Sequence, residues 1–228
     1  MTRRINIILA RHGETSANAQ NMMQGSLVNL PLNDLGRRQA AALAEGMKDK
    51  KIDWILTSQL NRAIETASYV SKYHSAVPVF RDERLNEISW GKADGKDNKT
   101  IGPIVKSVTG AWVAGDFDAR IPDGESANEC KERILAAFAD LLHKARKRNY
   151  ENVFVCIHGR IMRVIMSVLV DKDLRTMERF THANCCYHQL EVEVEDDAEA
   201  LPDPWTLKFK PVCIDARDHL VALQRPRI

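Results

Sequence analysis

Two apolar segments of this sequence each end in a His-Gly pair, and these pairs constrain the fold more than any other feature. Residues 5–10 lead into Arg11-His12-Gly13, and residues 153–157 lead into His158-Gly159. Short apolar runs of this kind are typical of strands buried on both faces of a parallel sheet. Because the carboxyl ends of parallel strands meet at one sheet edge, where α/β proteins commonly bind ligands, we expect both histidines at that edge.

The segments around these runs alternate between strand and helix patterns. Asn33 is a candidate N-cap for one helix, and Ser126 with Glu129 resembles a capping box for another. Between residues 81 and 124 the pattern is poor and rich in glycine, which is typical of a functional loop or lid. The pattern predicts helices over about 35–50, 60–73, 101–113, 126–148 and 161–170, and further short strands over 54–56 and 77–80.

The end of the sequence has the pattern of an antiparallel hairpin. Apolar and polar residues alternate over 187–194 and again over 205–209, and the polar turn 196–199 separates them. Pro211 is expected to end the second strand or to lie on a sheet edge. The predicted fold is an α/β three-layer sandwich with a mostly parallel central sheet flanked by helices, plus a C-terminal antiparallel hairpin. We expect it to form a single domain over residues 1–228.

Charge balance and cysteine content restrict the class of protein. The 33 basic and 31 acidic side chains nearly cancel, which gives no support for binding to nucleic acid or to a membrane. Five cysteines occur without a CxxC pair, so reduced and mostly buried thiols are expected rather than a zinc or redox site. No apolar run is long enough to span a bilayer, and the first four residues leave no room for a signal peptide. We therefore expect a cytoplasmic protein.

Four segments carry similar chemistry at equivalent positions in the predicted sheet. Arg11-His12 ends one strand, residues 58–62 and Glu87 follow two others, and His158-Gly159 ends the fourth. The planar donor fork of an arginine fits phosphate oxygens, and an imidazole is a nucleophile near neutral pH. Two arginines, two histidines and one carboxylate are thus expected in one pocket. Taken singly, each has an ordinary alternative: a capping loop, a surface helix arginine, a core histidine or a loop carboxylate.

Six sequence blocks in this order resemble the histidine phosphatase superfamily, also called phosphoglycerate mutase-like, and within it the broad-specificity phosphatase branch. The resemblance covers nearly the whole chain, and it ends with Asp218-His219-Leu220, which is similar to a family ending. The blocks are Arg11-His12-Gly13-Glu14-Thr15 with Asn18; Pro31-Leu32 with Gly36 and Gln39-Ala40; residues 57–63 with Thr66-Ala67; Leu85-Asn86-Glu87 with Trp90-Gly91 and Gly95; residues 122–126; and His158-Gly159.

The resemblance implies how the constellation handles a phosphate. His12 attacks phosphorus and becomes phosphohistidine. Arg11, Arg62 and His158 hold the three non-bridging oxygens and offset the charge that builds on them. Glu87 protonates the leaving oxygen and later removes a proton from the attacking water, because the two steps run in opposite senses. His12, Glu87, His158, Arg11 and Arg62 are therefore the expected catalytic residues.

Further donors are implied around the phosphate. Asn18 and the amide of Gly159, at a helix N-terminus, add hydrogen bonds to it. Cationic side chains take the part that a metal would play, so neither a metal nor a cofactor is expected. The residues implied to bind substrate are Arg11, Asn18, Gln24, Gly25, Arg62, Glu87, Trp90, His158, Gly159 and Arg160.

Several basic residues near these blocks allow two interpretations. Arg160 departs from the small or neutral residue of many relatives, and with Arg163 it either adds positive charge at the rim or is a solvated helix arginine. Lys92, Lys96 and Lys99 either indicate a substrate with a further anionic group or are ordinary solvated loop lysines.

The sequence favours a metal-independent phosphomonoesterase that acts through phosphohistidine on a phosphorylated metabolite. The alternatives are a cofactor-dependent phosphoglycerate mutase and, in another class, an inactive domain used as a binding module. The mutase pattern resembles Trp-Arg-Arg where this chain has Trp112-Val113-Ala114, and its segment between the acid block and the second histidine is longer. The expected partner is a small phosphorylated substrate, without nucleic acid or membrane; the oligomeric state is open.

Overall fold

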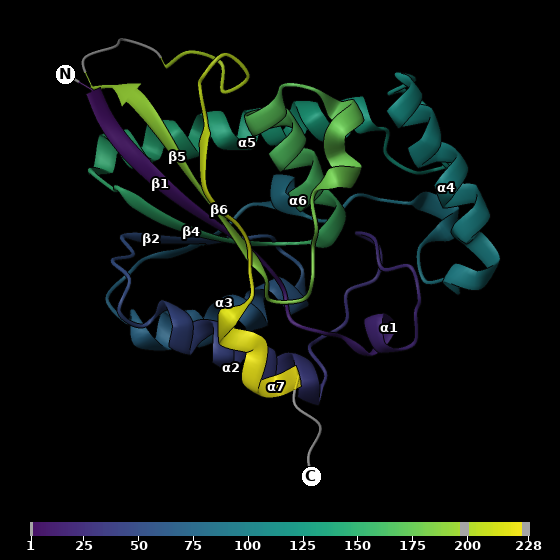
Figure 1. Ribbon diagram of the computed structural model, residues 1–228, viewed down its shortest axis with the longest axis horizontal. Helices are drawn as coiled ribbons and strands as arrows, with labels where there is room; N and C mark the ends of the chain where they lie inside the picture. Colours follow the sequence, from purple (N-terminus) through teal and green to yellow (C-terminus); the bar gives the residue numbers. More distant parts are fainter. Residues whose placement is uncertain (1, 197–200, 225–228) are drawn as a thin grey trace.

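The computed structural model describes residues 2–196 and 201–224, and its centre is a six-stranded mixed sheet (Figure 1). The strand order is β3-β2-β4-β1-β5-β6. The first four strands in this order are parallel, whereas β5 and β6 pair antiparallel at the other edge. The strands are β1 (Thr2–Arg11), β2 (Trp54–Thr57), β3 (Val79–Arg81), β4 (Asn152–Ile157), β5 (Tyr187–Glu195) and β6 (Lys210–Ala216).

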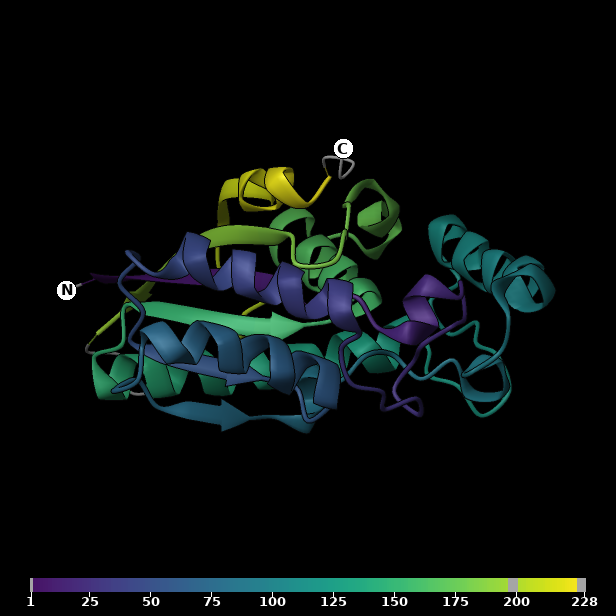
Figure 2. The same cartoon turned by 90° about the horizontal axis from the view of Figure 1, so that it is seen from below.

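Helices cover both faces of this sheet, which confirms the predicted three-layer sandwich (Figures 1 and 2). One face carries α2 (Asp34–Met47) and α3 (Asn61–Tyr73), and the other carries α5 (Ala127–Arg148) and α6 (Gly159–Met166). The remaining helices are α1 (Ser16–Ala19), α4 (Asn98–Ala114) and α7 (Val221–Gln224), with 3-10 turns at Glu83–Leu85, Gly91–Ala93, Leu174–Arg179 and Asp218–Leu220 and a π-helical turn at Ser167–Asp171. No helix in the described part of the chain is long and apolar enough to cross a membrane.

The apolar residues of β1 divide between two cores because successive side chains of a strand point to opposite faces. Ile5, Ile7 and Leu9 pack into the core beneath α5 and α6. Ile8 and Ala10 pack into the core beneath α2 and α3. β4 is divided in the same way, so both strands are buried on both faces as their continuous apolar pattern predicts.

The predicted helix starts agree with the structure where a capping residue marks them. Asn33 accepts a 2.8 Å hydrogen bond from the Gly36 amide and opens α2. Ser126 and Glu129 form a reciprocal capping box at the start of α5. The helix predicted over 101–113 is longer and spans Asn98–Ala114, capped by Asp97. The helix predicted over 161–170 begins earlier, at Gly159, and its last turn is π-helical.

The predicted second strand of the hairpin is wrong in position. Residues 205–209 form a turn and an irregular segment, and β6 begins only at Lys210. Asp203 fixes this turn, because its side chain accepts from the Trp205 amide and its carbonyl accepts from the Thr206 amide. Pro211 lies inside β6, which is the edge strand where a missing N–H is tolerated. Residues 197–199 of the predicted polar turn 196–199 lie outside the described residues.

Two glycines allow the loop after β1 to touch the start of α2. A Cβ built on Gly36 would lie 2.0 Å from the carbonyl oxygen of Glu14, and one on Gly13 would lie 2.5 Å from the carbonyl oxygen of Gly36. Real Cβ atoms do not approach so closely, so both positions require glycine. This contact holds the segment that follows His12 against the helical layer.

Candidate active site

A cavity of about 190 Å³ opens where β1 ends and α6 begins. Figure 2 shows α1 and α4 beyond the carboxyl ends of β1 and β4, on this side of the sheet. Predicted site residues that line the cavity are Arg11, His12, Asn18, Gln24, Glu87, Trp90, Gly159 and Arg160. Residues 22, 23, 98 and 182 complete the lining. The parallel strand ends and their loops thus meet at one place, as the sequence pattern predicts.

His12 follows β1 directly, and its side chain is only 2% exposed. Its Nδ1 lies 2.7 Å from the carbonyl oxygen of Gly13. A carbonyl only accepts, so Nδ1 carries the proton and the lone pair is on Nε2. Burial lowers the pKa of His12 well below its usual value, and the guanidinium groups of Arg62 and Arg11 lower it further. The ring is therefore neutral at physiological pH and has a free nucleophilic nitrogen.

Two buried donors in the cavity lining have no hydrogen-bond partner. They are Nε of Arg11 and Nε2 of Gln24. The rest of each side chain is fixed: Arg11 donates through Nη1 to the carbonyl oxygen of His182, and Gln24 accepts a 2.6 Å bond from the Thr15 hydroxyl. Buried donors without partners are rare in native structures. The presence of both residues in the lining of one cavity indicates a site for an anionic oxygen acceptor.

Arg62 and His158 are absent from the cavity lining and lie behind it, both fully buried. Arg62 donates through Nε to Nδ1 of His158 over 3.1 Å, and through its terminal nitrogens to the carbonyl oxygens of Val28 and Gly25. The rings of His12 and His158 lie 5.2 Å apart. Burial lowers the pKa of Arg62 to about 10, so it remains charged at neutral pH. The pair therefore places positive charge beneath the His12 ring.

Glu87 binds the N-terminus of α6. Its Oε2 accepts from the Arg160 amide at 3.0 Å, and its Oε1 accepts from the Ile161 amide at 2.9 Å and from the Ile88 amide at 3.1 Å. A carboxylate suits this position because the first N–H groups of a helix lack partners within it. Oε2 makes one of these bonds, which leaves it a lone pair in the cavity that Glu87 lines.

Asn18 and Gly25 have different surroundings. The side-chain oxygen of Asn18 accepts from the amide and hydroxyl of Thr15, each at 3.2 Å, so its NH2 group is the end left for the cavity. Gly25 is absent from the lining. A Cβ there would lie 2.0 Å from Oδ1 of Asp94, and the Gly25 carbonyl holds Arg62. The predicted contact of Gly25 with substrate is thus replaced by a contact with Arg62.

The basic residues near the rim fall into two groups. Arg160 and Arg163 are neither solvated nor free, because each donates to one oxygen of the Glu178 carboxylate and is only 15% exposed. Arg160 also lies over the ring of Trp90, 5.6 Å from its centroid. Lys92, Lys96 and Lys99 are exposed and absent from the cavity lining, and Lys92 pairs with Asp123 at 3.6 Å. The lysines therefore agree with the ordinary alternative.

Sequence reasoning missed the segment before β5. His182 lines the cavity, and Asn184 donates to the carbonyl oxygen of His12 at 3.1 Å and to the side-chain oxygen of Asn18 at 3.4 Å. Burial and the charge of Arg11 lower the pKa of His182 to about 3. An available signal was the topology, because an antiparallel neighbour of β1 begins at the edge where β1 ends.

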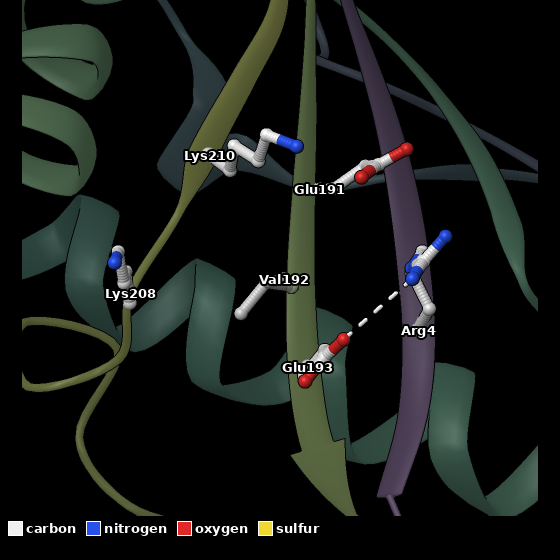
Figure 3. A pocket seen from close by; sticks show the side chains of 6 residues that line it. All are labelled: Arg4, Glu191, Val192, Glu193, Lys208 and Lys210. Carbon is white, nitrogen blue, oxygen red and sulfur yellow. Dashed lines mark ion pairs between the residues drawn. The ribbon is translucent and has the colours of Figure 1, made fainter.

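A second hollow, which we call the sheet hollow, lies over β1, β5 and β6 near the start of β1 (Figure 3). Its charged side chains are Arg4, Lys208, Lys210, Glu191 and Glu193, and Arg4 pairs with Glu193 at 3.7 Å. Both partners of this pair are more than half exposed. Mixed charges in water carry little specific chemistry. Within residues 2–196 and 201–224, no group of three or more His, Cys, Asp or Glu side chains is arranged to hold a metal ion.

Comparisons with known proteins agree with this geometry. The model of the histidine phosphatase superfamily (branch 1) matches residues 7–200. Phosphoglycerate mutase-like protein 4 of Arabidopsis thaliana is 33% identical over 159 residues, which are 69% of this chain and 67% of that protein. The structure of a mycobacterial glucosyl-3-phosphoglycerate phosphatase superposes with a TM-score of 0.78 at 24% identity, covering 95% of this chain and 100% of that one.

A further solved structure has the same fold. The α-ribazole phosphatase of Shigella flexneri superposes with a TM-score of 0.72 at 22% identity, covering 93% of this chain and 96% of that one. The family match extends over most of the chain and includes the β1, β2 and β4 strand ends that build the cavity. The protein therefore belongs to branch 1 of the histidine phosphatase superfamily.

Proposed function

We propose that this protein is a metal-independent phosphomonoesterase in which His12 forms a phosphohistidine intermediate. The observation that carries the proposal is the pairing of a neutral histidine with unpartnered donors in one cavity. Nδ1 of His12 is held by the Gly13 carbonyl, and Nε of Arg11 and Nε2 of Gln24 lack acceptors. A phosphate group supplies an electrophilic phosphorus atom for the histidine and oxygen acceptors for the two unpartnered donors.

The first chemical step transfers the phosphoryl group to the enzyme. Nε2 of His12 donates its lone pair to phosphorus, and the bond from phosphorus to the leaving oxygen breaks. Arg11, Gln24 and Asn18 bind the non-bridging oxygens through N–H groups that line the cavity. These donors stand in place before charge develops, which is how fixed dipoles lower a barrier. Water then attacks the phosphohistidine and returns the lone pair to Nε2.

The N-terminus of α6 supplies another donor in this proposal. Glu87 accepts from the amides of Arg160 and Ile161, and the carbonyl oxygen of His158 accepts from the Met162 amide at 3.0 Å. In the described part of the chain, the Gly159 amide is therefore the N–H group of this first turn that has no acceptor. Gly159 lines the cavity, so a phosphate oxygen bound there lies at the positive end of the helix.

Glu87 is the proposed proton carrier. In the first step Oε2 gives a proton to the leaving oxygen, and in the second step it takes one from the attacking water. Oε2 is the suitable atom because Oε1 is already bound by two amides. Arg62 contributes positive charge from beneath the site, and His158 orients Arg62 through Nδ1.

The proposed substrate is a small phosphorylated metabolite. The cavity of about 190 Å³ is smaller than the typical pocket for a drug-sized ligand. The similar solved structures include phosphatases whose names refer to glucosyl-3-phosphoglycerate and α-ribazole phosphate, both small molecules. The five cysteines are unpaired, which is typical of a reducing compartment and supports a cytoplasmic location.

The decisive test measures phosphate release from p-nitrophenyl phosphate in the presence of a metal chelator. We expect turnover by the wild type and essentially none by His12→Ala, with unchanged circular dichroism. His143→Ala is the matched control, because His143 is exposed on α5 and absent from the cavity lining. A phosphoenzyme trapped by quenching should be labile in acid and stable in base. Active His12→Ala, or a trapped phosphoserine, would contradict the proposal.

Two other functions remain candidates. A phosphoglycerate mutase is favoured by the name of the Arabidopsis relative, phosphoglycerate mutase-like protein 4, and it shares the first chemical step. An inactive binding domain is disfavoured because every residue of the proposed chemistry is present. Product analysis distinguishes a mutase from a phosphatase. The assay with chelator distinguishes an inactive binding domain from a phosphatase.

A further inference from the structure

Asn184, just before β5, links two residues of the candidate active site. Its side-chain NH2 group donates to the carbonyl oxygen of His12 at 3.1 Å and to the side-chain oxygen of Asn18 at 3.4 Å. A carbonyl oxygen only accepts, so the end of the Asn184 amide that faces His12 is the NH2 group. Both hydrogens of this group are thus in use, and Asn184 itself lies outside the cavity lining.

The bond to Asn18 affects the direction in which the Asn18 amide points. Oδ1 of Asn18 also lies 3.2 Å from the amide nitrogen and 3.2 Å from the hydroxyl oxygen of Thr15. A hydroxyl has one proton, however, and the Thr15 hydroxyl has a closer acceptor in Oε1 of Gln24, at 2.6 Å. The Asn18 oxygen is therefore held by two N–H donors, from Thr15 and Asn184, which leaves the NH2 group of Asn18 for the cavity.

The bond to His12 acts on the backbone that carries the proposed nucleophile. The carbonyl oxygen of His12 accepts a second bond from the Cys185 amide at 3.3 Å, so two consecutive residues hold it. The amide of Arg11 donates to the carbonyl oxygen of Cys186 at 3.0 Å. Residues 184–186 therefore fix the end of β1 at the point where His12 reaches the cavity.

The segment that carries Asn184 is itself held in place. Cys185 has a φ of 56°, in the left-handed region, which a residue other than glycine keeps only when its surroundings hold it there. Nε2 of His219 donates to the carbonyl oxygen of Cys185 at 2.8 Å, and the His219 ring stacks on that of Tyr187 with centroids 5.8 Å apart. His219 belongs to the motif at 218–220, so this C-terminal motif supports the segment behind the site.

We propose that Asn184 is a positioning residue, which turns the Asn18 amide toward a bound phosphate and fixes the backbone of His12. This inference rests on the proposed phosphomonoesterase function, and it assigns a task to a residue that does not touch the substrate. With Asn184 in place, both groups stand in their working geometry before phosphate arrives. Without it, the Thr15 amide is the remaining N–H donor to the Asn18 oxygen in the described part of the chain. The Asn18 amide can then rotate and present its oxygen to the phosphate.

The first test measures the dissociation constant of inorganic phosphate by calorimetry, which needs no turnover. Asn184→Leu keeps a side chain of similar size and removes both donors. We expect it to weaken phosphate binding by about tenfold, the size of one hydrogen bond to a charged group. In an Asn18→Ala background the same substitution should change the constant by less than about twofold, because the amide that Asn184 orients is gone. Equal losses in the two backgrounds would indicate a merely structural role and would overturn the inference.

The bond to His12 gives a second, separable readout. In the Asn18→Ala background, Asn184→Leu should still lower kcat for p-nitrophenyl phosphate by about tenfold, because the His12 carbonyl loses one of its two donors. The effect on phosphate affinity then requires Asn18 whereas the effect on turnover does not. A general loosening of the fold does not produce this split. An unchanged kcat, in a parent that is active, would overturn the role assigned to the bond with His12.

Asn6→Leu is the matched control. Asn6 lies on the same strand as the end that Asn184 holds, is half-buried, and donates through its side chain to the side-chain oxygen of Asn152 at 3.1 Å. It lies outside the cavity lining, so its substitution should leave phosphate affinity and kcat unchanged. A loss of phosphate affinity equal to that of Asn184→Leu would show that any loosening of β1 has this effect, and would overturn the inference.

A second variant keeps the test decisive if Asn184→Leu does not fold. Asn184→Ser leaves the position polar, but a hydroxyl has one hydrogen and cannot serve both oxygens. We expect the same loss of phosphate affinity, again only when Asn18 is present. A serine variant that binds phosphate as tightly as the wild type would contradict the proposal.

The positioning proposal and the proposed function fail separately. A wild type that binds phosphate with the expected dependence on Asn184 and Asn18, but does not release phosphate from p-nitrophenyl phosphate, contradicts the phosphatase proposal alone. A wild type that turns this substrate over while Asn184→Leu binds phosphate as tightly as its parent contradicts the Asn184 proposal alone. A wild type that does not bind phosphate contradicts both.

Discussion

Nε of Arg62 donates a 3.1 Å hydrogen bond to Nδ1 of His158. The bond requires a lone pair on Nδ1, so the proton of this imidazole is on Nε2, which lies 2.7 Å from the hydroxyl of Ser58. Burial, followed by the charge of Arg62, lowers the pKa of His158 well below its usual value, which keeps the ring neutral. In this arrangement His158 fixes Arg62 and has no donor left for a phosphate oxygen.

Arg62→Lys tests the importance of the guanidinium shape. Lysine keeps the charge but cannot donate at once to His158, Val28 and Gly25, as Arg62 does. Buried acceptors without a donor cost roughly 1–3 kcal/mol each, so we expect a loss of stability of about this size and a fall in kcat/KM of about 100-fold. Urea denaturation and p-nitrophenyl phosphate kinetics measure the two effects. Activity within about twofold of the wild type would contradict the role of Arg62.

Stability should fall when the pH is lowered through the ordinary titration range of histidine. The pKa values of His12 and His158 are depressed in the folded state, so the unfolded chain binds protons below pH 6.5 that the folded chain does not. The free energy of unfolding is therefore highest above this pH and decreases below it. Each neutral buried histidine contributes a loss of roughly 1.4 kcal/mol at about pH 5.5.

His158→Gln isolates one of these contributions. Gln can accept from Nε of Arg62 but does not titrate, so the pH-dependent loss should be smaller than in the wild type by roughly 1.4 kcal/mol between about pH 7.5 and 5.5. Urea denaturation at both pH values measures the difference. Equal losses in the two proteins would show that His158 does not couple protonation to unfolding.

Gly159→Ala tests the close packing at the start of α6. A Cβ there would lie 2.4 Å from Cδ2 of His182 and 3.2 Å from Nε of Arg11, so the His182 ring must move and Arg11 must give by a few tenths of an ångström. We expect kcat/KM to fall by about tenfold or more, although alanine favours helix. Gly102→Ala in α4 is the control, because nothing lies within 4 Å of its Cβ position. It should retain full activity and gain up to about 1 kcal/mol of stability.

Glu87→Gln tests the proton carrier through the choice of leaving group. An alkyl alkoxide needs a proton as it departs, whereas p-nitrophenolate needs it much less. We expect the variant to lose phosphoenzyme formation strongly with an alkyl phosphate and weakly with p-nitrophenyl phosphate. Quenched-flow measurement of the phosphoenzyme gives both rates. Equal losses would indicate that Glu87 only positions α6 through the amides of Arg160 and Ile161.

The strand ends could be predicted because their signals are local. The apolar runs before His12 and His158 have the length and continuity of buried parallel strands, and these strands pair directly as β1 and β4. Asn33 and Ser126 have capping side chains next to apolar patterns, so the starts of α2 and α5 followed from the sequence. Glu87 lies in an irregular loop, so its position after a predicted strand indicated the sheet edge, and the resemblance to a family indicated its role.

The parts that could not be predicted depend on tertiary contacts. Trp205 alternates with Leu207 as in a strand, but the turn at Asp203 and a contact with Lys131, whose Nζ lies 3.9 Å from the Trp205 ring centroid, hold it in an irregular segment. Arg160 and Arg163 appeared free because their partner, Glu178, is 15 or more residues away in the sequence. Charge pairing across such distances has no periodic signal.

The last prediction is that the protein releases phosphate from 3-phosphoglycerate and does not convert it to 2-phosphoglycerate. The structure removes the sequence argument for this prediction, which was the absence of arginines after Trp112. Trp112 is fully buried and stacks on Trp90, while Val113 and Ala114 lie at the end of α4, exposed. The cavity residue of α4 is Asn98, at its other end, about 20 Å away along a helix of this length. Positions 113 and 114 do not line the cavity, although the neighbouring Trp112 contacts Trp90, which does, so the absence of arginines there no longer carries the prediction.

The argument depends instead on the residues that line the cavity. A mutase must hold a carboxylate firmly while its substrate re-orients and must keep water from the phosphohistidine. Here the arginines that line the cavity are Arg11 and Arg160, and Arg160 is already bound by Glu178. A weakly held product leaves and water takes its place, so hydrolysis should exceed transfer. Phosphorus NMR of the products and the lifetime of the phosphoenzyme decide the matter: rapid formation of 2-phosphoglycerate, with a phosphoenzyme that outlives many turnovers, would identify a mutase.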